Sequence, residues 1–331
     1  MKKTINWAVA GTGGISNAFI LGLKEAEGAN AIAVVSRSTN NAENFAAKYG
    51  VAKAYDNFDA MLDDPGIDVV YLGVPHSVHK DMAIRAFKAG KAVLCEKPAA
   101  INAAELSEMI RCAREHNVFF MEALWTRFVP PVRKAREWLA EGLIGEARMF
   151  QGNFGFRAPV PPEHRLLDIK QGGGALLDAG VYPISFASMV FGGVKPRKIS
   201  GVLSMGETGV DEEAAALIYW GPHKTAMISA ALSLATVSDA WIYGTGGYIH
   251  LPSFVFCRNA NLVMNNKQYS RWEGDFWGNG YNYEAEAVMD CLREGKTECD
   301  VMPLDESLVI AQIMDEIRRQ WGFVYPGEQN P

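Results

Sequence analysis

A lysine follows a buried-looking apolar segment in the stretch Val93-Leu94-Cys95-Glu96-Lys97-Pro98. The apolar residues are typical of a strand covered on both faces. In open α/β sheets, the carboxyl ends of parallel strands face the ligand crevice. Pro98 disfavours helical backbone at Lys97 and so holds it extended. An ammonium fixed there could stabilise negative charge on a reacting oxygen, although a surface Glu-Lys pair is the alternative.

A glycine turn joins the first predicted strand to the first predicted helix. Its sequence is Gly11-Thr12-Gly13-Gly14-Ile15-Ser16. Gly11 allows the tight turn, Gly13 allows close approach of a pyrophosphate, and the helix N-terminus presents N–H groups to the anion. Ser16 replaces the third small residue of the dinucleotide fingerprint. We expect Gly11, Thr12, Gly13, Gly14 and Ile15 to bind a dinucleotide; the alternative is a tight turn without a ligand.

The end of the second predicted strand indicates which nicotinamide cofactor is preferred. An NAD site usually has an acid here for the ribose 2′-hydroxyl, whereas an NADP site has arginine. This chain has Ser36-Arg37-Ser38. One guanidinium and two hydroxyls suit a 2′-phosphate, so NADP is predicted, with NAD possible but weaker. The alternative is that Arg37 is only a solvated surface residue.

The elements around these residues divide into two patterns. Residues 1–124 alternate strand and helix signals, which predicts an α/β Rossmann domain with a doubly wound parallel sheet. Residues 125–331 begin with helices and a glycine-rich loop and continue with consecutive strands, which predicts an α+β domain with an open, mostly antiparallel sheet. We expect the first domain to bind the dinucleotide and the second to bind substrate and form a dimer.

Composition excludes several classes of protein. The formal net charge of -6, without a long basic run, argues against nucleic-acid binding. No apolar stretch reaches the roughly 18 residues of a membrane span, and the apolar run near the N-terminus is too short for a signal peptide. The five cysteines form no CxxC pair, which favours reduced thiols in the cytoplasm over disulfides or zinc.

Several motifs together resemble the glucose–fructose oxidoreductase/inositol dehydrogenase/MocA (Gfo/Idh/MocA) family. They are AGTGGIS, VYLGVPHSVH, CEKPAA and GGGALLDAGVY, and they extend over the chain. Within the family the chain looks closest to dimeric dihydrodiol dehydrogenases and NADP-linked xylose dehydrogenases, on the segments MEALWTRF, KPRKIS and ETGVDEEAA. The resemblance implies tightly held NADP(H), with His76, His79, Glu96 and Lys97 near the cofactor.

The resemblance also implies a catalytic group. Many family members have an aspartate followed four residues later by histidine, where this chain has Asp178 and Tyr182. This spacing places both residues on one helix face. Tyr182 then becomes the proton donor and acceptor, with a pKa lowered from about 10 by Lys97, and Asp178 orients Lys97. The alternatives are a first-turn acid that complements the helix dipole and a packed aromatic ring.

Aromatic residues suggest the class of substrate. Trp125, Phe154, Arg157 and Tyr182 are the predicted substrate-binding residues, and aromatic walls suit sugar faces or a cyclic diol. For the aromatic residues, a place in the core or at an interface is the alternative. His76 and His79 lack a third ligand, so no metal is expected. We therefore expect an NADP(H)-dependent oxidoreductase acting on a polyol; the alternative is a nucleotide-binding sensor of the same fold without turnover.

Overall fold

The computed structural model describes residues 2–265 and 267–328, which form two compact units. The first unit contains Met1–Ala100, Ala104–Phe128 and Trp277–Leu304, and the second contains Ile101–Ala103, Val129–Phe276 and Asp305–Pro331. The sequence predicts a single boundary between 124 and 125. The two units are discontinuous in sequence, because Trp277–Leu304 packs with the first unit, and the predicted boundary stays a prediction.

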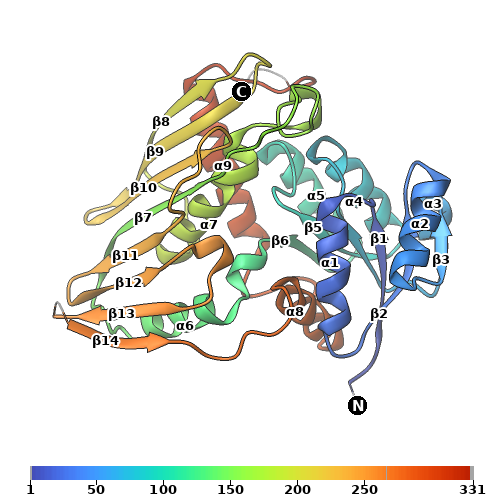
Figure 1. Ribbon diagram of the computed structural model, residues 1–331, viewed down its shortest axis with the longest axis horizontal. Coiled ribbons are helices and arrows are strands. Elements are labelled where there is room, and N and C mark those ends of the chain that lie inside the picture. The colour runs from blue at the N-terminus through green and yellow to red at the C-terminus, as the bar shows by residue number, and fades with distance from the viewer. Residues whose placement is uncertain (1, 266, 329–331) are drawn as a thin grey trace. The chain divides into compact units, whose positions relative to one another are not determined.

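The first unit is built on a six-stranded parallel sheet in the order β3-β2-β1-β4-β5-β6 (Figure 1). This is a Rossmann strand order: the chain adds strands outward on one side of β1 and then, from β4 on, outward on the other side. Valine, alanine and leucine dominate the central strands, and all four residues of β4 are fully buried. The strands are β1 (Ile5–Ala10), β2 (Ala29–Val35), β3 (Lys53–Tyr55), β4 (Val69–Leu72), β5 (Ala92–Glu96) and β6 (Phe120–Ala123).

Helices connect these strands and one late helix joins them. The late helix α8 (Tyr281–Arg293) packs on α1 (Gly14–Glu25). The contact is close because Gly22 has no side chain, and Asn279 Nδ2 donates to Ala18 O at 2.7 Å beside it. The remaining helices are α2 (Thr39–Tyr49), α3 (Phe58–Leu62), α4 (His79–Lys88), α5 (Ala103–Glu115) and the 3₁₀ turns η1 (His76–Val78) and η2 (Trp125–Arg127).

The second unit contains an eight-stranded sheet in the order β14-β13-β12-β11-β7-β10-β9-β8 (Figure 1). Strands β7 and β10 are parallel and the other neighbouring pairs are antiparallel. The predicted fold class is therefore confirmed. The strands are β7 (Ala147–Gly155), β8 (Lys198–Met205), β9 (Asp211–Gly221), β10 (Lys224–Ala231), β11 (Ala240–Gly244), β12 (Gly247–Leu251), β13 (Ala260–Met264) and β14 (Lys267–Trp272).

Helices cover one face of this sheet. Neighbouring strands place Ile218, Ala226, Phe150, Ile242 and Ile249 in one row, and each is fully buried. The covering helices are α6 (Pro130–Ala140), α7 (Val181–Val190) and α9 (Leu304–Gln320). A π-helical turn, η4 (Leu176–Gly180), precedes α7, and the 3₁₀ turns η3 (Ile169–Gln171) and η5 (Phe254–Phe256) lie in loops. Among the described residues, no helix is long and apolar enough to cross a bilayer.

The end of the chain is fastened by a buried arginine. Arg318 NH1 donates to Glu328 Oε2 at 2.7 Å and its NH2 donates to Asp315 Oδ1 at 2.6 Å. Arg318 also lies 5.0 Å from the ring centroid of Tyr325. The Tyr325 hydroxyl donates to Gly173 O at 2.7 Å, so the terminal segment is bonded to the glycine-rich turn before η4.

Removing the buried charge of Arg318 should destabilise the protein far more than removing the surface charge of Arg319. Arg318→Gln should lower the free energy of unfolding by about 3–5 kcal/mol, because two carboxylates lose their cation. Arg319→Gln is the matched control: Arg319 pairs with Glu316 at the surface, and such pairs contribute about 0–1 kcal/mol. Urea denaturation measures both values, and equal losses would contradict this assignment.

Candidate functional site

The glycine turn between β1 and α1 has the shape that a pyrophosphate needs. Gly11 has a φ of +96°, and a Cβ there would collide with Gly73 O. In contrast, a Cβ at Gly13 or Gly14 would meet no atom within 4 Å. No side chain caps the N-terminus of α1, so its backbone N–H groups remain available to an anion. The turn therefore fits a dinucleotide phosphate.

The serine at the third fingerprint position has a structural task. Ser16 is fully buried, and its hydroxyl donates to Gly73 O at 3.3 Å. This bond ties the first turn of α1 to the end of β4. A small polar residue thus serves here as well as glycine, because it fits the space and uses the neighbouring carbonyl.

The residues after β2 leave one cation available. Arg37 is exposed, and no ion pair joins it to any other described residue. Ser38 caps α2, because its hydroxyl accepts from the Asn41 N–H at 3.3 Å. Ser36 Oγ accepts from the Ser38 N–H at 3.4 Å. The two hydroxyls thus shape the turn, and the guanidinium of Arg37 is left for an anionic group.

The segment after β5 is fixed by buried carboxylates. Glu96 Oε1 accepts from the Tyr71 hydroxyl at 2.6 Å, and Glu96 Oε2 accepts from the Lys97 N–H at 3.2 Å. Burial and the neighbouring Glu96 raise the pKa of Tyr71, so its hydroxyl keeps its proton and donates. Glu122 Oε1 accepts from the Ala99 N–H at 3.0 Å. Lys97 itself is half-buried and directly follows β5.

The two histidines at the start of α4 are buried. His79 Nδ1 lies 3.0 Å from Pro98 O, and its Nε2 lies 2.9 Å from Val74 O. These contacts hold the backbone at Pro98, directly after Lys97, so the role of His79 here is structural support. His76 is 4% exposed, and its ring packs edge-on against His79 at 5.6 Å. No group of three metal-ligating side chains occurs among the residues that the structure describes.

Asp178 in the second unit has a cation that the sequence analysis did not predict. Arg165 NH1 donates to Asp178 Oδ1 at 3.0 Å and to its Oδ2 at 3.3 Å. The carboxylate is buried, whereas the arginine is 44% exposed. Asp178 lies in the π-helical turn η4, and Tyr182 lies in the first turn of α7. Such π turns occur frequently at functional sites.

The loop that carries Arg165 is held by local bonds. The Gly174 N–H donates to Leu166 O at 3.0 Å, and the Gly173 N–H donates to Asp168 O at 3.1 Å. Asp168 also accepts from the Lys170 N–H and from the Gln171 side chain, and these bonds lower its pKa. The loop is therefore ordered around its two glycines.

Tyr182 belongs to an aromatic cluster. The ring of Phe154 lies edge-on to Tyr182 at 5.4 Å between centroids, and it also contacts Phe156 at 5.7 Å and Phe256 at 6.2 Å. Phe256 comes from η5 and is 61% exposed, although it is a large apolar residue. Phe256 is not predicted from the sequence, because no periodic signal marks this loop.

Two predicted substrate residues have different surroundings. Trp125 is 4% exposed and packs against Tyr281 at 4.9 Å within the first unit, so little of its ring is accessible. Arg157 follows β7 and is exposed, and no ion pair joins it to another described residue. Phe154 and Tyr182 are thus the two predicted substrate residues that the structure brings together.

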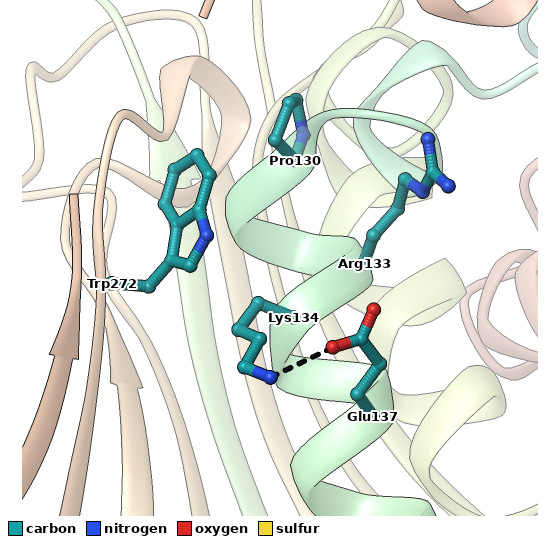
Figure 2. A pocket seen from close by; sticks show the side chains of 5 residues that line it. All are labelled: Pro130, Arg133, Lys134, Glu137 and Trp272. Atoms are coloured by element: carbon teal, nitrogen blue, oxygen red, sulfur yellow. Dashed lines mark hydrogen bonds and ion pairs between the residues drawn. The ribbon is translucent and has the colours of Figure 1, made fainter. Parts of the chain in front are cut away.

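A shallow hollow lies elsewhere in the second unit, between α6 and β14. It is lined by Pro130, Arg133, Lys134, Glu137 and Trp272 (Figure 2). Lys134 Nζ bonds to Glu137 Oε2 at 2.8 Å, so one of the two cations that line the hollow is paired with an acid. None of the predicted site residues lines this hollow, and we assign it no part in the chemistry.

Sequence profiles match most of the chain. Residues 5–124 match an oxidoreductase family with an NAD-binding Rossmann fold, and residues 132–250 match the GFO/IDH/MocA C-terminal domain. Two relatives named trans-1,2-dihydrobenzene-1,2-diol dehydrogenase come from Xenopus laevis and Homo sapiens. They are 37% and 36% identical, and the matches cover 97% and 98% of this chain and 99% of each relative.

Solved structures share the fold. An aldose-aldose oxidoreductase from Caulobacter crescentus, complexed with glycerol, superposes with a TM-score of 0.88 at 23% identity, over 96% of this chain and 97% of its own. A 3-ketoreductase from Actinomadura kijaniata, in complex with NADP and TDP-benzene, superposes with a TM-score of 0.84 at 24% identity, over the same shares.

The chain belongs to the GFO/IDH/MocA family of oxidoreductases. The predicted family and the predicted nicotinamide-dependent oxidoreductase activity are confirmed. The curated relatives are named as dehydrogenases, and nothing in their names supports the alternative of a sensor without turnover.

Proposed function

We propose that this member of the GFO/IDH/MocA family interconverts a secondary alcohol and its carbonyl on a cyclic diol, sugar or related polyol, with NADP(H) as the preferred cofactor. The relatives named as dihydrodiol dehydrogenases support this substrate class. The observation that carries the proposal is the aromatic cluster around Tyr182, with Phe154 edge-on to it and Phe256 largely exposed. Aromatic faces suit the apolar faces of rings that carry hydroxyl groups.

Tyr182 is proposed to move the proton. In the oxidation direction its phenolate accepts the hydroxyl proton of the substrate, and in reduction its phenol returns a proton to the oxygen. The cofactor, when bound, accepts or supplies the hydride. Lys97 is proposed to hydrogen-bond the same oxygen and to stabilise its negative charge. Its ammonium would also lower the pKa of Tyr182.

Asp178 is proposed to support this pair electrostatically. From the sequence, Asp178 is expected to orient Lys97. Two hydrogen bonds from Arg165 also reach its carboxylate. A carboxylate that accepts these bonds is suited to hold cations.

The cofactor is proposed to bind along the ends of β1, β2 and β5. Gly11, Thr12, Gly13, Gly14 and Ile15 would hold the pyrophosphate, and Ser36, Arg37 and Ser38 would hold the 2′-phosphate. His76, Glu96 and Lys97 are proposed to lie near the nicotinamide half. His79, which is fully buried, would act through the backbone of Pro98.

A homodimer is proposed to form through the open face of the eight-stranded sheet. The register places Leu217, Met227, Gln151, Trp241 and His250 in one row across five strands of that face. Val202 and Leu217 are 56% and 55% exposed. An exposed apolar face of this kind is typical of an interface, and a second copy would cover it.

We also propose a cytoplasmic location, since all five cysteines are free and buried.

The proton carrier is tested by removing one oxygen atom. Tyr182→Phe should reduce turnover by about a hundredfold to ten-thousandfold and leave NADPH affinity nearly unchanged. Lys97→Met should also slow turnover, and the double variant should be little slower than the slower single variant, because both groups act on one oxygen. Steady-state kinetics and NADPH fluorescence measure these effects. Near-normal turnover in Tyr182→Phe would mean that another group carries the proton.

Cofactor preference is tested at the end of β2. Arg37→Ala should weaken NADPH binding by about tenfold to a hundredfold, because a charge-assisted bond worth about 1.5–3 kcal/mol is lost. NADH lacks the 2′-phosphate and serves as the internal control, with an unchanged dissociation constant. Equal affinity of the wild type for NADPH and NADH would refute the proposed preference.

The dimer is tested by placing charge on the open face. The wild type should have about twice the chain mass of 36.3 kDa in light scattering at micromolar concentration. Leu217→Arg should shift it to the monomer mass, because the partner would bury an unpaired charge. Leu21→Arg is the matched control: Leu21 is 51% exposed on α1, outside the sheet. A monomeric wild type would exclude this proposal.

A further inference from the structure

Asp211, the first residue of β9, is a buried carboxyl group that the proposed mechanism does not use. It is fully buried within the ETGVDEEAA segment. Its Oδ2 accepts from the Leu176 N–H at 2.6 Å. Its Oδ1 has no hydrogen-bond partner among the described residues, and no cation lies within ion-pair distance of it there. A buried carboxyl in such surroundings is unusual and costly.

The bonded amide begins the helical segment that carries the proposed chemistry. Leu176 opens the π-helical turn η4, which contains Asp178 and leads directly to Tyr182 in α7. The N-termini of helical segments attract negative charge, because their N–H groups point outward. A carboxylate at this point therefore fixes where the segment starts.

The glycine turn before Leu176 is shaped around the same carboxyl group. Gly174 has a φ of +128°, and a Cβ there would collide with Asp211 Oδ1. Gly173 O accepts from the Tyr325 hydroxyl at 2.7 Å. The turn is thus held by Asp211 and by Tyr325.

Ionisation of Asp211 lowers the stability of the fold. Burial and, to a smaller extent, Asp178 raise its pKa to about 7, against the opposing effects of the Leu176 N–H and Arg318. The ordinary value is 3.8. Because the folded-state pKa lies above the unfolded one, stability falls as the pH rises from about 4 through about 7. The charged groups near it are Asp178 and Arg318, and the Tyr325 hydroxyl remains neutral because burial raises its pKa.

We propose that Asp211 is a positioning residue: its carboxylate fixes the start of the segment that carries Asp178 and Tyr182, and the fold tolerates the cost for the sake of turnover. If the residue served stability alone, an asparagine of the same shape would stabilise the fold more, because its side chain carries no charge. The inference rests on the proposed function, and its test includes a readout that needs no substrate.

Asp211→Asn separates the positioning role from a structural one. The variant should melt at a higher temperature than the wild type at pH 8, and the difference should shrink at pH 5, where Asp211 is protonated. Its kcat should nevertheless fall by about tenfold with little change in KM, because a neutral acceptor holds an N–H less strongly than a carboxylate. Glu212→Gln, the next residue on β9, is the matched control and should change neither quantity. A more stable Asp211→Asn with normal kcat would overturn the inference.

Amide exchange of the wild type provides the second measurement, which covers a variant that fails to fold. After correction for the intrinsic pH dependence, protection of the Leu176 N–H should fall by about tenfold between pH 8.5 and pH 5.5, although global stability does not fall with it. Unchanged local protection would overturn the inference. If protection falls as expected but no polyol is turned over by the wild type, the proposed function fails and the hold on Leu176 stands.

Discussion

Buried carboxylates bonded to backbone N–H groups hold both segments that carry the predicted chemistry. In the first unit, Glu96 and Glu122 accept from the N–H groups of Lys97 and Ala99. In the second unit, Asp211 accepts from the N–H of Leu176. A hydrogen bond to an ionised carboxylate is stronger than one to a neutral acceptor, and these bonds fix the backbone rather than the reacting side chain. The lysine and the tyrosine therefore extend from segments whose backbone these bonds restrain.

This arrangement places function and stability in opposition. A buried carboxyl without a cation costs stability once it ionises, and the raised pKa of Asp211, about 7, reflects that cost. Elsewhere in the same unit, Arg318 offsets the burial of Asp315 and Glu328 with direct ion pairs. The contrast is informative because both environments lie close to the glycine turn at Gly173. Asp315 and Glu328 each have a direct ion pair with Arg318, whereas Asp211 has no ion pair among the described residues.

Local patterns allowed much of the fold and part of the site to be predicted. Five of the six parallel strands follow from contiguous apolar runs, and the turn at Gly11 follows from its place between strand and helix. The segments β3, β13 and β14 were not predicted, and β3 is a three-residue strand without an apolar run. The return of α8 to α1 depends on contacts distant in sequence. Arg165 and Phe256 lie outside regular strands and long helices, where residue type does not indicate where a side chain points. Asp211 begins a strand, and the strand pattern does not indicate that its carboxyl group is buried.

We propose that hydride passes between a carbinol carbon of the substrate and the nicotinamide while Tyr182 carries the proton. A single-turnover reaction with NADP⁺ and a cyclic diol deuterated at the carbinol carbons measures this transfer. Mass spectrometry should find one deuterium in the reduced nicotinamide, and the step should be slower than with the undeuterated diol. If the nicotinamide gains no deuterium from deuterated cyclic diols, sugars or other polyols, hydride transfer from this substrate class is contradicted.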